Sequence, residues 1–91
     1  MQLGLDEAAC LLMAAGCHQE ADPRMAMFAL SAADHLQRAG AEIRPLALND
    51  VRSAIADALR TLAALPDDVF AEDPVADAVD DAHEALAAVS G

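Results

Sequence analysis

Lysine, tryptophan and tyrosine are absent from this 91-residue chain, and phenylalanine occurs only twice. Without lysine, five arginines stand against 16 acidic residues, and the formal net charge is −11. A surface of that sign repels phosphate backbones and anionic lipid heads. The composition therefore argues against a nucleic-acid-binding protein and against a protein that binds membranes through a basic helix, and we expect no nucleic-acid or membrane partner.

Several functional motifs are also missing. The four glycines are isolated from one another, which excludes a glycine-rich phosphate loop, and no G-x-S-x-G nucleophile elbow occurs. No apolar run reaches the length of a membrane span, and no basic segment precedes an apolar one at the N-terminus. Two cysteines without framework spacing are typical of a reducing compartment. We therefore expect a cytoplasmic protein that is not an enzyme, without a signal peptide.

Alanine is abundant, with 24 residues, whereas leucine, isoleucine, valine and phenylalanine together number 21. Alanine favours helix, and no segment shows the alternation of a strand. The sequence thus predicts an all-α protein, a compact antiparallel four-helix bundle made of two helical hairpins, as a single domain over residues 1–91. Because so many apolar residues are small, the core should be thin, and a second copy or a partner could complete it.

Capping residues divide the chain. Asp22 is a candidate N-cap, Pro23 suits the first helical position and Gly40 suits the end of the same helix. Asp73 and Pro74 repeat this start signal, and Asn49 or Asp50 marks the start of the helix between them. The predicted helices span residues 5–16, 23–39, 49–65 and 74–89.

Two of these helices are apolar on more than one side. The first carries Leu11 and Met13 beside its main stripe, and the second carries Met27 and Leu30 on an additional edge. A helix that is apolar over a wide arc is buried from several directions. We therefore predict an apolar partner-binding surface that consists of Leu11, Met13, Met27 and Leu30.

The segment from residue 67 to residue 84 contains eight acidic residues and no lysine or arginine. Its negative field attracts basic surfaces. The alternative interpretation is a solvated helix face that keeps an alanine-rich protein in solution. The predicted electrostatic partner-binding residues are Asp67, Asp68, Glu72, Asp73, Asp77, Asp80, Asp81 and Glu84.

Metal binding has weak candidates in Cys10, Cys17, His18 and His83. On one continuous helix, Cys10 and Cys17 would lie about 10.5 Å apart along the axis, too far for a disulfide. Their separation also differs from the spacing of structural zinc sites. Asp80 and His83 share a helix face, but the chain has no Glu-x-x-His motif of di-iron bundles. We expect no metal and no cofactor.

A further histidine, His35, lies seven residues after Phe28 and leans towards the apolar side of its helix. Its position predicts a partly buried ring with a satisfied nitrogen, although a pH-sensitive interface is the alternative. Its neighbour Asp34 should pair with Arg38 one helical turn later.

Taken together, these patterns predict a non-enzymatic, small acidic protein–protein interaction protein. It would act as an adaptor, a small subunit or an inhibitor of a basic partner, and would self-associate as a homo-oligomer or join a larger complex. The alternative is a small ligand- or metal-binding helical bundle that uses cysteine and histidine side chains.

Overall fold

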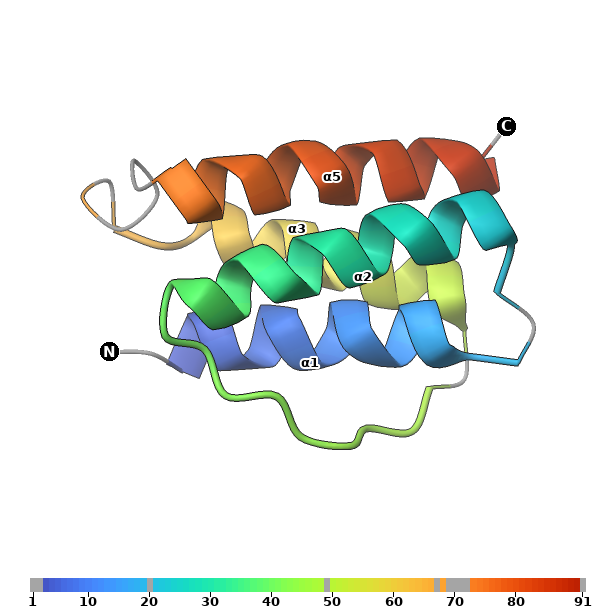
Figure 1. Ribbon diagram of the computed structural model, residues 1–91, viewed down its shortest axis with the longest axis horizontal. Helices are drawn as coiled ribbons and strands as arrows, with labels where there is room; N and C mark the ends of the chain where they lie inside the picture. The colour runs from blue at the N-terminus through green and yellow to red at the C-terminus, as the bar shows by residue number, and fades with distance from the viewer. Residues whose placement is uncertain (1–2, 20, 49, 67, 69–72, 91) are drawn as a thin grey trace.

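The computed structural model describes residues 3–19, 21–48, 50–66, 68 and 73–90, and it confirms the all-α bundle. The described residues contain four helices and no strand (Figure 1). They are α1 (Leu3–Cys17), α2 (Pro23–Arg38), α3 (Val51–Ala63) and α5 (Asp73–Ser90). Each predicted helix is found, and the observed ends differ from the predicted ends by a residue or two, which is the ordinary uncertainty of helix termini.

The helices form two antiparallel hairpins, α1 with α2 and α3 with α5 (Figure 1). Between the hairpins, α2 packs against α5 and α1 packs against α3, so every helix has two antiparallel neighbours. This arrangement requires α2 and α3 to run in the same direction. The chain achieves it by returning along the outside of α1 in an irregular stretch, residues 41–48, which we call the crossover segment (Figure 1).

Two N-caps confirm start signals in the sequence. The Asp22 carboxylate accepts hydrogen bonds from the backbone N–H groups of Arg24 and Met25, at 2.9 and 3.2 Å. Asp50 caps α3 by accepting hydrogen bonds from the backbone N–H of Ser53 (3.0 Å) and from its hydroxyl (2.6 Å). Each cap satisfies backbone donors that have no partner within the helix.

Gly40 ends α2 with a positive φ of 107°. Its N–H donates to the carbonyl of Gln37 (3.0 Å), and the N–H of Ala41 donates to the carbonyl of Leu36 (3.0 Å). These two bonds constitute a Schellman motif, whose left-handed residue is usually glycine. The motif turns the chain sharply from α2 into the crossover segment.

The core is built largely from alanine, as the composition suggests. Among the described residues no polar side chain is buried, and the largest fully buried side chains are Leu12, Met25, Leu36, Ile55, Leu62 and Val75. Buried alanines contributed by all four helices fill the rest of the interior. Small side chains let helix axes approach closely, so the core is dense but offers little apolar area per residue.

The inward face of α5 differs in detail from its pattern of large apolar residues. Val79 and Leu86 are only partly buried, whereas Ala78 and Ala85 are completely buried. The helix therefore turns its alanines and Val75 towards the interior and places Val79 and Leu86 at the edges. Close packing of the helices favours this rotation, because the smallest side chains occupy the narrowest space.

Candidate functional site

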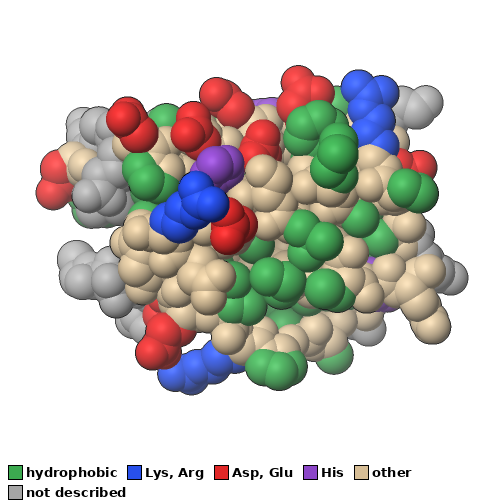
Figure 2. All heavy atoms as spheres, viewed as in Figure 1, with side chains coloured by type: hydrophobic (Ala, Val, Ile, Leu, Met, Phe, Trp, Pro, Cys, Tyr) green, Lys and Arg blue, Asp and Glu red, His purple; other side chains and the backbone are tan. Residues whose placement is uncertain are grey.

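Four carboxylates on α5 form one line on the surface. Asp73, Asp77, Asp80 and Glu84 recur at intervals of three and four residues and are all exposed. At 1.5 Å per residue this acidic stripe is about 16 Å long. The buried residues of α5 lie on the opposite side of the helix. Figure 2 shows acidic side chains gathered along the edge of the molecule that α5 occupies.

Within the described part of the chain, no arginine pairs with a carboxylate of α5. Arg38 pairs with Asp34 (3.1 Å), Arg44 with Glu42 (3.2 Å) and Arg60 with Asp57, each within its own segment. The first of these is the predicted i, i+4 pair. These three arginines therefore neutralise acidic neighbours outside α5, and the acidic stripe has no arginine partner among the described residues.

Asp81, which sequence reasoning grouped with the partner-binding acids, has an internal role. Its Oδ2 accepts a hydrogen bond from the Ser31 hydroxyl (2.7 Å) and lies 3.4 Å from Nε2 of His35. The His35 side chain is 25% exposed. This confirms the prediction of a partly buried histidine whose ring nitrogen has a partner. The cluster connects α2 to α5.

The order of groups in this cluster does not match a catalytic triad. In a triad the histidine lies between the serine and the aspartate, and takes the proton from the serine. Here Ser31 and His35 both face the same oxygen of Asp81, so the serine proton points to the carboxylate. The arrangement stabilises the packing of two helices. The sequence shows that Ser31 and His35 lie one helical turn apart on α2. Nothing in the sequence indicates that Asp81 is their partner.

Three predicted acidic residues precede α5 in the sequence. Asp68 is exposed in the connection before α5. Asp67 and Glu72 lie outside the described residues.

The predicted apolar surface is divided between different environments. Met27 is 59% exposed on α2, whereas Leu11, Met13 and Leu30 are half-buried. Leu30 packs over Gly16 of α1, and Met13 lines a groove described below. Whether these residues bind a partner stays a prediction.

The predicted metal candidates are dispersed. Cys17 is exposed and its sulfur contacts that of Met13 (3.8 Å), while His83 is exposed on α5. His18 directly follows the C-terminal end of α1, whereas Cys10 lies in the middle of that helix. Among the residues that the structure describes, no three histidine, cysteine or acidic side chains are grouped closely enough to hold a metal ion.

Cys10 instead anchors the crossover segment. Its thiol donates to the carbonyl of Glu42 (3.6 Å) and its sulfur accepts from the N–H of Arg44 (3.2 Å). One turn earlier, the Asp6 carboxylate accepts from the N–H of Glu42 (2.8 Å). These contacts join residues more than thirty positions apart, so no local sequence pattern could have predicted them.

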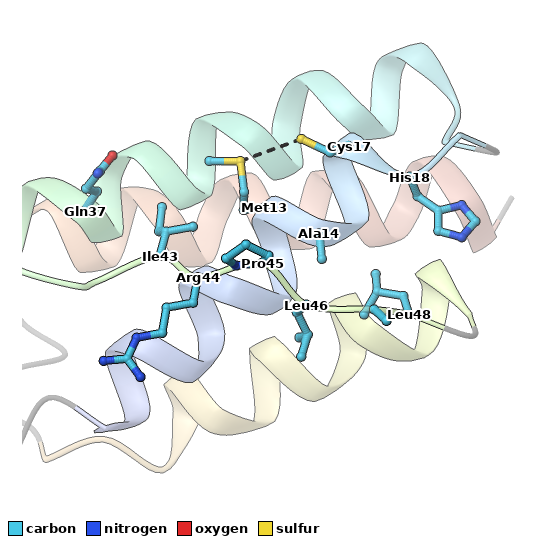
Figure 3. A pocket seen from close by; sticks show the side chains of 11 residues that line it. Met13, Ala14, Cys17, His18, Gln37, Ile43, Arg44, Pro45, Leu46 and Leu48 are labelled. Carbon is cyan, nitrogen blue, oxygen red and sulfur yellow. Dashed lines mark hydrogen bonds between the residues drawn. The ribbon is translucent and has the colours of Figure 1, made fainter.

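Beyond this anchor, the crossover segment and α1 enclose a groove of about 740 Å³ (Figure 3). Its floor and walls are mainly apolar. Gln37 and Arg44 lie at one end and His18 at the other. The full lining consists of Met13, Ala14, Cys17, His18, Gln37, Ile43, Arg44, Pro45, Leu46, Ala47 and Leu48.

Comparison with protein-family models, with curated proteins and with solved structures gives no match to this chain. In the part of the chain that the structure describes, every helix is too short or too polar to cross a lipid bilayer.

Proposed function

We propose that the chain is a small, non-enzymatic interaction protein that docks a basic surface of a partner protein through the acidic stripe on α5. The observation that carries the proposal is the line of four exposed carboxylates, none of which forms an ion pair with an arginine of the described chain. Complementary charge speeds encounter and selects among partners. The partner surface should present arginine or lysine at a similar spacing over about 16 Å.

Local energetics support a role beyond folding. Carboxylates at i, i+3 and i, i+4 on a helix repel one another by a few tenths of a kcal/mol per pair. Asp77, Asp80 and Glu84 lie beyond the first turn, where a negative charge gains little from the helix dipole. The stripe therefore costs stability, as residues placed for binding often do.

Association with a different protein has more support than self-association. Two copies that each carry a formal charge of −11 repel each other. Among the described residues only Met27 and Leu46 are large hydrophobics classed as exposed, and they lie on different elements. We propose a heteromeric complex in the cytoplasm, a location supported by two cysteines that form no disulfide with each other.

A titration with an arginine-rich peptide tests the location of the binding surface. Amide chemical shifts should move along α5, and the affinity should fall steeply as salt rises from about 0.05 to 0.5 M, because screening shortens the range of the field. The variant Asp77→Asn/Asp80→Asn/Glu84→Gln, called the stripe variant, should lose most of the binding.

The matched control is Glu7→Gln/Asp34→Asn/Glu42→Gln, which removes three exposed acids elsewhere and therefore has the same net charge. This control variant should bind nearly as tightly as the natural chain. If both variants lose the same affinity, net charge alone drives binding and the proposed site is wrong.

A further inference from the structure

The groove between α1 and the crossover segment has the size and lining of a ligand site. Its volume of about 740 Å³ lies within the range of small-molecule pockets, ~300–1,000 Å³. Met13 lines it from α1, and Ile43, Leu46 and Leu48 line it from the crossover segment (Figure 3). Extended over residues 43–48, the crossover wall is at most about 18 Å long. That shape suits a linear apolar molecule.

The described lining of this groove differs in charge from the acidic surface of the rest of the molecule. The structure describes 13 of the chain's acidic residues, and none of these 13 lines the groove. The lining contains one arginine, Arg44, at one end and His18 at the other. A guanidinium at the mouth, with no carboxylate among the described lining residues, favours an anionic head group over a cationic one.

Arg44 is accessible for such a contact. Its side chain is 79% exposed, and its ion pair with Glu42 joins two exposed groups. Exposed pairs of this kind contribute little to stability. A ligand carboxylate can therefore displace Glu42 from Arg44 at a small cost in free energy.

The crossover segment, which forms the outer wall of the groove, can change conformation when a ligand binds. Residues 42–48 make no backbone–backbone hydrogen bond with any described residue. Side-chain contacts with Asp6 and Cys10 hold the start of the crossover segment, and Ile43 and Leu48 pack against the core. Between them, Pro45, Leu46 and Ala47 are exposed. Movement of these three residues breaks no backbone hydrogen bond within the described chain.

We propose that this groove binds a free medium-chain carboxylate amphiphile, of the fatty acid class. The alkyl chain lies along Met13, Ile43 and Leu46, and the carboxylate pairs with Arg44. This site shares no residue with the acidic stripe and does not depend on the function proposed for α5.

Calorimetric titration of the natural chain with octanoate, decanoate and dodecanoate, each below its micellar concentration, tests the proposal. We expect one saturable site whose affinity rises up to about fourfold for each added methylene group. Decanol should bind more weakly than decanoate, and decyltrimethylammonium more weakly still. The absence of saturable binding, or tightest binding of the cation, would overturn the proposal.

Two matched pairs of variants locate the site. Leu46→Asp should weaken decanoate binding at least tenfold, whereas Met27→Asp, the same change at an exposed position outside the groove, should leave it unchanged. Arg44→Gln should weaken decanoate about fivefold without affecting decanol, and Arg52→Gln is its control. Equal effects within both pairs would contradict the assigned site. Circular dichroism checks each fold, and Arg44→Gln remains decisive should Leu46→Asp unfold.

Discussion

Single residues at the helix ends determine where this chain turns, and Gly40 is the clearest case. Its φ of 107° lies in a region that side chains with a β-carbon rarely adopt. The two hydrogen bonds of the Schellman motif depend on that conformation.

We expect Gly40→Ala to destabilise the protein by about 1–2 kcal/mol, because the left-handed conformation strains the new side chain. Asparagine tolerates that conformation better than alanine, so Gly40→Asn should cost less. Urea denaturation of the three proteins measures the order. Equal stability of the alanine variant and the natural chain would show that the motif does not hold this geometry in solution.

The carboxyl group of Asp50 makes the free energy of unfolding depend on pH. Hydrogen bonds from the Ser53 hydroxyl and backbone hold the pKa of the Asp50 carboxyl below its ordinary value of 3.8. Because the folded pKa is lowered, the contribution of Asp50 to stability is present above about pH 3.8 and is lost as pH falls through the folded value.

The free energy of unfolding should therefore fall more steeply below pH 3.8 for the natural chain than for Asp50→Asn, which keeps a capping oxygen but cannot titrate. Ser53→Ala should raise the pKa of Asp50, since it removes the largest cause of the shift. Carbon NMR of the carboxyl group measures this pKa directly. An unchanged pKa in Ser53→Ala would contradict the assigned cause.

At the scale of elements, Gly16 sets the approach of α1 to α2. A β-carbon at this position would lie 2.6 Å from Cγ of Leu30. At Gly4 the nearest atom, Cδ2 of Leu65 at 2.7 Å, is the end of a flexible side chain that can move away.

Gly16→Ala should therefore destabilise the protein by about 1 kcal/mol through overpacking, whereas Gly4→Ala should be close to neutral. In a Leu30→Ala background, Gly16→Ala should become neutral or stabilising, which a double-mutant cycle detects. If the two substitutions prove additive, Leu30 is not the obstacle.

The charges of α5 lead to an opposite expectation, a gain in stability. The stripe variant relieves repulsion between acids one turn apart and should stabilise the protein by about 1 kcal/mol at low salt. The control variant, with equal net charge, should be neutral or slightly destabilising, because it removes the pairs with Arg38 and Arg44. Thermal unfolding at two salt concentrations compares them. A loss of stability in the stripe variant would mean that these acids serve the fold.

At the scale of the whole molecule, local features could be predicted from the sequence, whereas contacts between distant segments could not. Alanine content, the caps at Asp22, Asp50 and Gly40, and the Asp73-Pro74 start signal predicted the helices, because those signals are local. The Ser31–Asp81 bond and the contacts of Cys10 with Glu42 and Arg44 join distant segments. They depend on which helices become neighbours, so the groove and the internal role of Asp81 could be found only in the structure.

The net charge of −11 also bears on the assembly state. We expect the purified protein to sediment as a monomer at low ionic strength, where repulsion between copies is strongest. Sedimentation velocity at low and high salt provides the measurement. A stable dimer at low salt would favour self-association through apolar surface and would contradict the heteromeric proposal.

The central claim is that the acidic stripe on α5 selects a basic protein partner. Its most direct test is capture from native lysate by the immobilised natural chain, the stripe variant and the control variant, followed by mass spectrometric identification. We predict that the natural chain and the control variant retain a protein with a basic surface. The stripe variant should not retain this protein, and high salt should release it from the other two forms. Retention of the same proteins by all three forms, or of none by the natural chain, would contradict the account.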